Sequence, residues 1–196
     1  MDKICILGRD ALPGSLALRG GESLRLTLVA LPGVSCEGVL TLDLNGPGCQ
    51  VDLAGLYLCR GDENVRLQIR VLHHAGLCHL RQLFKGIVGG TARADFDGLI
   101  RVDPDAQKTE AYQEAHTILL SDQARISARP QLEIYADDVV CSHGATAGFL
   151  DPDEQFYMRS RGIPEAEARR LQMLSFLSPV LERLPEDLQK EITDAL

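Results

Sequence analysis

Alternating apolar and polar residues recur along the first 150 positions of the chain. In residues 24–28, three leucines alternate with Arg25 and Thr27, and residues 40–44 and 65–71 carry Leu, Val or Ile at every second position. This period of two predicts β-strands with one buried face and one wet face. Turn residues separate the runs, at Gly33, Gly46-Pro47-Gly48, Gly61-Asp62 and Gly89-Gly90.

From Asp151 the pattern changes to that of helices. Asp151 is a suitable N-cap with Pro152 in the first helical position, and Gly162 suits the left-handed residue that ends a helix. A second helix is expected from Pro164, and Pro179 is expected to kink or restart it. A last short helix is expected from Pro185. The apolar stripe predicted for the helices consists of Leu171, Leu174, Leu177, Leu181, Leu184, Leu188 and Ile192.

Composition narrows the possible partners and the compartment. The 196 residues carry a formal net charge of −8, which argues against nucleic acid or an anionic membrane as a main partner. No apolar run reaches the roughly 20 residues of a membrane span, and the first residues lack the apolar core of a signal peptide. The six cysteines show irregular spacing and are interpreted as free thiols in a reducing compartment. We therefore expect a cytoplasmic protein.

Potential metal ligands are densest in residues 130–148. A strand ending near Ile134 is followed by a turn at Asp137-Asp138, and a second strand places Cys141 and His143 on one face. Their roughly 6.6 Å separation along the backbone suits a shared metal better than a catalytic dyad. Thiolate and imidazole together suit iron, zinc or copper(I). The alternative is that both side chains only pack.

A second group of such residues comprises His73, His74, Cys78 and His79. Neighbouring strand residues face opposite ways, whereas metal ligands must converge. Packing and turn formation are therefore favoured for this group, and a metal-dependent enzyme that uses it is kept as an alternative. The chain has no phosphate-binding glycine motif, and the spacing of its residues indicates no Ser/His/Asp catalytic arrangement. We therefore expect no enzyme activity.

Several motifs resemble one family. L-E-I-Y-A-D-D-V-V-C-S-H-G-A-T (132–146) and F-Y-M-R-S-R-G-I-P (156–164) are similar to the C-terminal signature of the SufB/SufD iron–sulfur cluster assembly scaffolds. R-Q-L-F-K-G-I-V (81–88), A-Q-K-T-E-A-Y-Q (106–113) and L-L-S-D-Q-A-R (119–125) fit that family in the same order. Periodicity alone leaves a solenoid, a sandwich and a jelly roll open. The resemblance implies an all-β core, a right-handed parallel β-helix, over residues 1–150 and a small α-helical C-terminal domain over residues 151–196.

The resemblance also implies site residues and partners. His143 matches a histidine proposed to lie at the SufB–SufD junction, which makes it a candidate ligand of a nascent iron–sulfur cluster, with Cys141 beside it. Ala115 stands where SufB carries a cysteine, which favours a SufD-like role beside a SufB-like chain; a homodimer is the other arrangement. Family members are longer, so the chain resembles an N-terminally short form.

The resemblance further implies that the start of the helical region contacts a SufC-type ABC ATPase. Aromatic residues beside arginines are typical of interfaces. The alternative is that these aromatics pin the first helix to the solenoid. At the level of the whole protein, the alternative is a β-solenoid interaction subunit without metal chemistry. The expected ATPase contacts are Phe156, Tyr157, Arg159, Arg161, Gly162 and Ile163.

Overall fold

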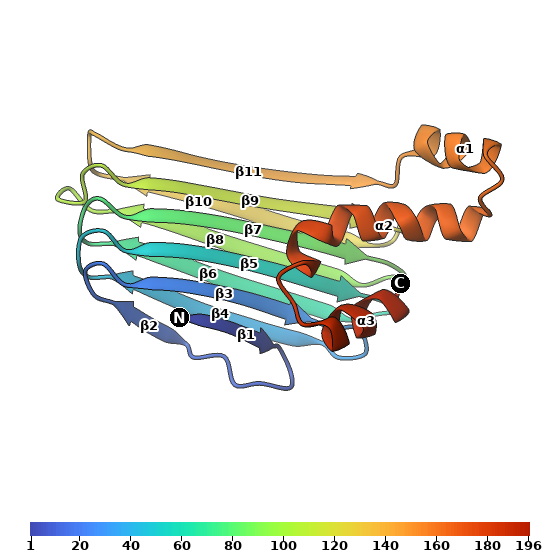
Figure 1. The fold of residues 1–196 in the computed structure, drawn as a ribbon, viewed down its shortest axis with the longest axis horizontal. Helices are drawn as coiled ribbons and strands as arrows, with labels where there is room; N and C mark the ends of the chain where they lie inside the picture. Colours follow the sequence, from blue (N-terminus) through green and yellow to red (C-terminus); the bar gives the residue numbers. More distant parts are fainter.

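The computed structural model describes residues 1–196 and shows two parallel sheets followed by three helices (Figure 1). The chain passes from one sheet to the other after every strand, so odd-numbered strands form the first sheet and even-numbered strands the second. The first sheet has the order β1 (Asp2–Ile6), β3 (Ser23–Ala30), β5 (Gln50–Cys59), β7 (His79–Val88), β9 (Glu110–Leu119) and β11 (Val140–Phe149). The second has the order β2 (Ser15–Leu18), β4 (Cys36–Leu44), β6 (Asn64–His73), β8 (Arg93–Val102) and β10 (Arg125–Ile134). The expected parallel β-helix is confirmed.

The lumen, the space between the two sheets, contains the main core. It holds a cluster of 33 buried residues, drawn from both sheets. Leu40, Leu42 and Leu44 are fully buried in it, as the alternation in residues 40–44 predicts. The strands predicted from residues 24–28 and 65–71 are confirmed in the same way as parts of β3 and β6. Each coil covers the apolar face of its neighbour, which is how a solenoid builds a continuous core.

One coil differs in length from the next, which explains why the sequence shows no fixed repeat. The side-by-side residues Arg25, Asp52, Arg81, Tyr112 and Ser142 follow one another across the first sheet. Their spacings along the chain are 27, 29, 31 and 30 residues. The strands stay in register because the turns absorb these differences.

A close approach inside the lumen depends on a glycine. The Tyr57 hydroxyl reaches Thr117 Oγ1 at 2.6 Å although the two residues lie two coils apart. Gly86 lies between them in register, and a Cβ there would be 1.9 Å from the Tyr57 ring. A residue with no side chain is therefore required at position 86.

The helices are α1 (Pro152–Ser160), α2 (Glu165–Leu181) and α3 (Glu186–Asp194). Asp151 caps α1 as predicted, since its carboxylate accepts the backbone N–H groups of Asp153 and Glu154. Gly162 takes the predicted left-handed conformation, with φ at 86°. None of the three helices combines the length and apolar composition of a membrane-spanning segment.

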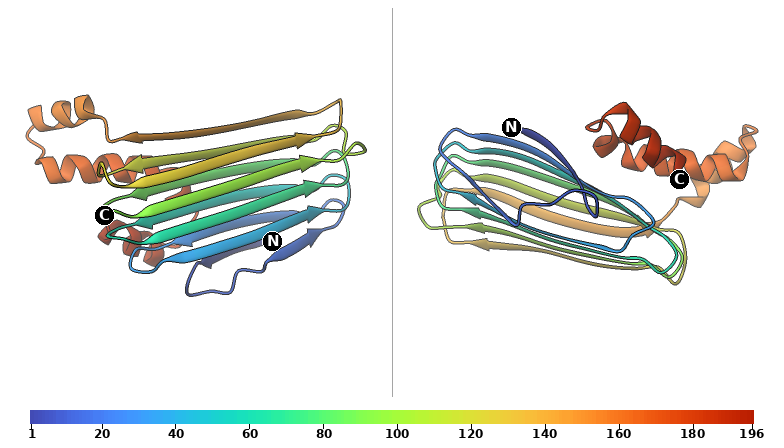
Figure 2. Two further views of the ribbon diagram at one scale, coloured as in Figure 1. Left: turned by 180° about the vertical axis from the view of Figure 1, so that it is seen from behind. Right: turned by 90° about the horizontal axis from the view of Figure 1, so that it is seen from below.

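The last two helices lie against the outer face of the first sheet near the carboxyl ends of its strands (Figure 1 and Figure 2). A second cluster of 14 buried residues forms there. The strands contribute Val29, Ala54, Leu56, Leu58 and Ile87, and the helical region contributes Met173, Leu177, Val180, Leu181, Leu184, Leu188 and Ile192 among others. From Leu53 onward β5 is consequently buried on both faces, and its sequence there does not alternate.

Of the two effects predicted for Pro179, a restart of the helix does not occur. Helix α2 includes Pro179 and ends at Leu181. Proline leaves the carbonyl four residues earlier without its usual partner, and here the Ser178 hydroxyl donates to that Ser175 carbonyl at 2.9 Å. The predicted stripe is also partly wrong, because Leu171 is 38% exposed and Met173 and Val180 face the sheet instead.

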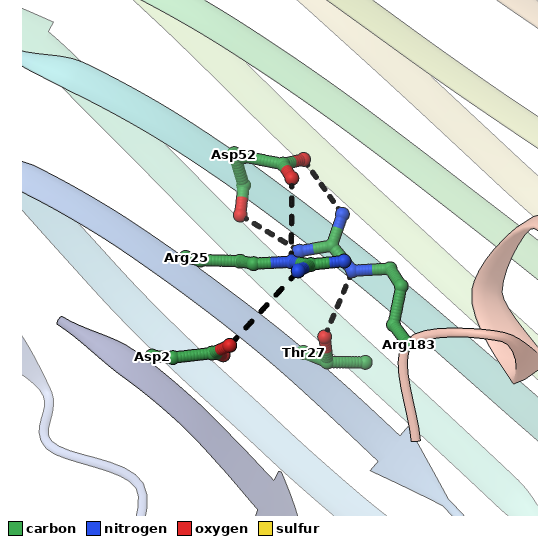
Figure 3. A network of polar contacts seen from close by, with 5 residues as sticks. All are labelled: Asp2, Arg25, Thr27, Asp52 and Arg183. Atoms are coloured by element: carbon green, nitrogen blue, oxygen red, sulfur yellow. Dashed lines mark hydrogen bonds and ion pairs between the residues drawn. The ribbon is translucent and has the colours of Figure 1, made fainter.

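Hydrogen bonds from Arg183 to Asp52 and Thr27, which we name the polar latch, join the helical region to the sheet (Figure 3). Arg183, which follows α2, donates from one guanidinium nitrogen to Asp52 Oδ1 at 2.6 Å and from another to the Asp52 carbonyl at 3.0 Å. Its third nitrogen donates to Thr27 Oγ1 at 3.1 Å. On the other side Arg25 lies 3.6 Å from the Asp52 carboxylate. The guanidinium thus crosses from the helical region to β3 and β5.

Candidate metal site at the open end of the solenoid

The coil formed by β10 and β11 has a neighbouring coil on one side only. Strand β10 pairs with β8 and β11 pairs with β9, and both lie at the edge of their sheets (Figure 1). We name this surface the open end. It exposes large apolar side chains, since Val140 is 56% and Phe149 61% exposed. The backbone groups along both outer edges are available for pairing, as at any free strand edge.

Cys141 and His143 both lie on the lumen side of β11. Cys141 is in register with Ala111, and His143 with Gln113, and both of these β9 residues are fully buried in the lumen. Residues in register on neighbouring parallel strands share a face, so the pair points into the mouth of the lumen. Cys141 is half-buried and packs against the core, whereas His143 is exposed.

Burial favours the protonated form of the Cys141 thiol. Burial raises its pKa, and a backbone hydrogen bond with Ala111 offsets part of this effect. A metal ion that bound here would displace the thiol proton, because the thiolate is the ligand. One sulfur and one imidazole are a suitable start for an iron site.

Two ligands do not complete a site. No group of three or more His, Cys, Asp or Glu side chains is positioned to hold a metal ion. Iron–sulfur clusters are commonly held by four protein ligands. Cys141 and His143 are thus at most two of the ligands that such a cluster needs.

Two further positions of interest lie on β9. Ala115 is buried in the lumen, so this chain presents no thiol there. The ring of His116 lies on the opposite face, where Nδ1 is 2.7 Å from Thr146 Oγ1 and Nε2 is 3.4 Å from Glu114. His116 therefore faces away from Cys141 and His143.

The four residues of the second group lie in different environments. His73 is buried, and burial together with the neighbouring His74 lowers its pKa to about 4. His74 lies outside, with its ring nitrogens 2.7 Å from Asp103 and 3.4 Å from Asp43. Cys78 is buried and donates to backbone carbonyls, and His79 is exposed beside Glu110. These side chains do not converge, as their alternation along the strands indicates.

The helix α1 presents a surface that touches little else. None of its residues is buried, and Phe156 and Tyr157 are 72% and 60% exposed. The idea that these aromatics pin α1 to the solenoid is therefore wrong. The Arg161 guanidinium stacks 5.3 Å from the Tyr157 ring centre, and Arg159 lies 3.5 Å from Glu165. This keeps the aromatic and basic side chains of the segment together.

Two glutamines near His143 were not singled out from the sequence. Gln82 and Gln113 lie in the lumen, and Gln113 is the register partner of His143. The available signal was a polar residue at the apolar phase of each strand, in L-R-Q-L-F and A-Y-Q-E-A. Such a residue breaks the alternation that otherwise defines these strands.

Comparison with known proteins gives consistent matches. The family model described as "SUF system FeS cluster assembly, SufBD core domain" matches residues 21–176. The iron–sulfur cluster assembly protein SufD of Escherichia coli is 38% identical over 148 residues, which are 76% of this chain and 35% of that protein. SufD of Bacillus subtilis is 33% identical over 157 residues, 80% of this chain and 36% of that protein. Protein ABCI7, chloroplastic, of Arabidopsis thaliana is 38% identical over 152 residues, 76% of this chain and 31% of that protein. The chain spans about a third of the length of these relatives.

Proposed function

The chain belongs to the SufB/SufD family of iron–sulfur cluster assembly proteins, and from that premise we propose that it is a SufD-like scaffold component. In this role it holds part of a nascent iron–sulfur cluster as cargo and catalyses no step itself. It acts together with a SufC-type ABC ATPase and a second β-helix chain.

The observation that carries the proposal is the incomplete ligand pair at the open end. Cys141 and His143 point into the lumen mouth from a coil that nothing covers. A second β-helix that paired with the free edges of β10 and β11 would bury the exposed Val140 and Phe149 and bring the missing ligands. A SufB-like chain suits this best because Ala115 leaves the present chain without a lumen thiol on β9. A second copy of the chain is the other candidate partner.

The ATPase contact is assigned to residues 156–163. An exposed helix with adjacent aromatic and arginine side chains has the composition of a partner-binding surface. Because α1 leads into α2, and α2 packs on the first sheet, a movement at α1 would be passed toward the solenoid. In this proposal residues 151–196 form the ATPase-docking part and residues 1–150 the cluster-bearing part. The contact residues are Phe156, Tyr157, Arg159, Arg161, Gly162 and Ile163.

Anaerobic purification of the tagged protein from its own host tests the partners. We expect a SufC-like ATPase and a SufB-like chain in the eluate, identified by mass spectrometry. The double substitution Phe156→Ser with Tyr157→Ser is expected to remove the ATPase and to leave the second chain bound. Retention of the ATPase by this variant would refute the assigned surface. Absence of both proteins from the wild-type eluate would refute the scaffold proposal.

Anaerobic iron and sulfide analysis of the same complex tests the site. His143→Ala is expected to lower the bound iron, whereas His79→Ala, a change of an exposed histidine elsewhere on the first sheet, is expected to leave it unchanged. Equal iron content in the two variants would favour the alternative, a β-solenoid interaction subunit without metal chemistry.

A further inference from the structure

Two glutamine side chains lie inside an otherwise apolar part of the lumen. Gln82 is 1% exposed and Gln113 is fully buried. Their register neighbour on β5 is Leu53, the kind of residue that lines most of the lumen. Burying an amide without full hydrogen bonding is costly. A polar pair at this place therefore needs a reason.

The two amides are hydrogen-bonded to each other, and each glutamine has one further polar side-chain atom without a hydrogen-bond partner. Gln113 Nε2 donates to Gln82 Oε1 at 3.1 Å. The carbonyl oxygen Oε1 of Gln113 and the amide nitrogen of Gln82 are buried and have no partner. Since the donor group of Gln113 is engaged by Gln82, its unused group is an acceptor.

The next residue in this column is His143. Gln82, Gln113 and His143 are in register on β7, β9 and β11, and neighbouring strands lie about 4.8 Å apart. Space for the Gln113 amide comes from the opposite sheet, because a Cβ on Gly98 would lie 2.4 Å from Gln113 Nε2. The column thus runs from the buried interior to the imidazole at the open end.

We propose that Gln113 is the positioning residue of His143. The imidazole turns toward the lumen and donates one N–H to Gln113 Oε1, which satisfies the buried acceptor and fixes the tautomer. The second ring nitrogen is then unprotonated and faces the open end, where it can bind a metal ion. Hydrogen bonds of this kind orient metal-binding histidines and raise their basicity. The inference rests on the proposed function, since it takes His143 to be a ligand.

Nitrogen NMR of the metal-free protein tests the hydrogen bond directly. At about pH 8 a free imidazole is neutral, and the ¹⁵N shifts of its two nitrogens report which one carries the proton. We expect one dominant tautomer for His143 in the wild type and a mixture in Gln113→Leu. Thr117→Val is the matched control, because it removes another buried lumen hydrogen bond on β9, the one to Tyr57. It is expected to leave the His143 tautomer unchanged.

Two results would overturn the inference. One is the same tautomer population in Gln113→Leu and the wild type, and the other is an equal change in Thr117→Val. The double variant Gln82→Leu with Gln113→Leu guards against misfolding, because replacing both partners of a buried hydrogen bond by apolar groups is close to neutral. It is expected to show the same mixed tautomers as the single variant.

Cobalt(II) binding separates this inference from the proposed function. The titration uses the complex with the second chain where that chain co-purifies, and the lone protein otherwise. His143→Ala is expected to abolish the cobalt absorption bands of the site, and Gln113→Leu to weaken the affinity by about 10- to 100-fold. Bands unchanged by His143→Ala would refute the metal site itself. Bands lost in His143→Ala with wild-type affinity in Gln113→Leu would refute only the role of Gln113.

Discussion

Replacing Arg183 by methionine should loosen the helical region from the solenoid. The guanidinium makes three hydrogen bonds, two to Asp52 and one to Thr27 (Figure 3). Its side chain is only 10% exposed, whereas that of Asp52 is 47% exposed. Methionine keeps much of the length and apolar volume but removes all three donors. The change therefore tests the polar latch separately from the apolar packing around it.

The size of the effect follows from this mixed exposure. An exposed ion pair contributes about 0–1 kcal/mol, whereas breaking a buried pair costs about 3–5 kcal/mol. Because water reaches Asp52 but hardly reaches Arg183, we expect a loss of about 2 kcal/mol. Arg183→Lys keeps the charge but cannot donate to three acceptors at once, so it should recover less than half of this loss.

Urea unfolding followed by circular dichroism measures the free energy of unfolding. For a chain of this size, a loss of about 2 kcal/mol also lowers the melting temperature by about 4–8 °C. Arg159→Met is the matched control, because Arg159 and its partner Glu165 are 57% and 59% exposed. Equal, small losses in Arg183→Met and Arg159→Met would refute the claim that the buried guanidinium holds the helices to the sheet.

Two further predictions concern the lumen. The buried His73 has a pKa of about 4, whereas an unfolded histidine has a pKa of about 6.5. Neutral His73 therefore stabilises the fold above about pH 6.5, and this contribution is lost as the pH falls toward 4. His73→Leu should therefore remove up to about 3 kcal/mol of the acid destabilisation seen in urea unfolding between these pH values, whereas the exposed His79→Leu should leave it intact. Gly86→Ala places a methyl group 1.9 Å from the Tyr57 ring and should cost about 1–3 kcal/mol by the same assay. Gly144→Ala, with no atom within 4 Å of the added carbon, should be tolerated, and equal losses at the two glycines would contradict the packing argument.

Alternation predicts the strands that have one buried face, and it fails where both faces are buried. Strands β4 and β6 follow their leucines, valines and isoleucines, whereas β5 also buries Ala54, Leu56 and Leu58 beneath the helices. Periodicity could not identify a solenoid either, because the coils differ in length. The parallel β-helix was predicted from family motifs, and the structure confirms it.

The candidate site shows the same limit. Spacing alone places Cys141 and His143 on one face of a strand, but it cannot say whether that face is the lumen or the outside. Gln113 and His143 are neighbours only because β9 and β11, about 30 residues apart in the sequence, pair in this register. A local sequence pattern cannot predict that register. Helix α2 continues through Pro179, where a serine hydroxyl one residue earlier donates to the freed carbonyl.

The packing of α2 and α3 sets an order on folding. Residues 165–194 pack on β3, β5 and β7, which precede them in the chain. The ribosome therefore synthesises the apolar outer residues of these strands before the helices that bury them. During that interval Val29, Leu56, Leu58 and Ile87 face water on a sheet that can already form. Exposed apolar surface on nascent chains promotes aggregation and chaperone binding. Solubility of the solenoid during synthesis thus depends on residues 165–194, which are made after its strands, and a nascent chain arrested before Leu171 should be a chaperone client.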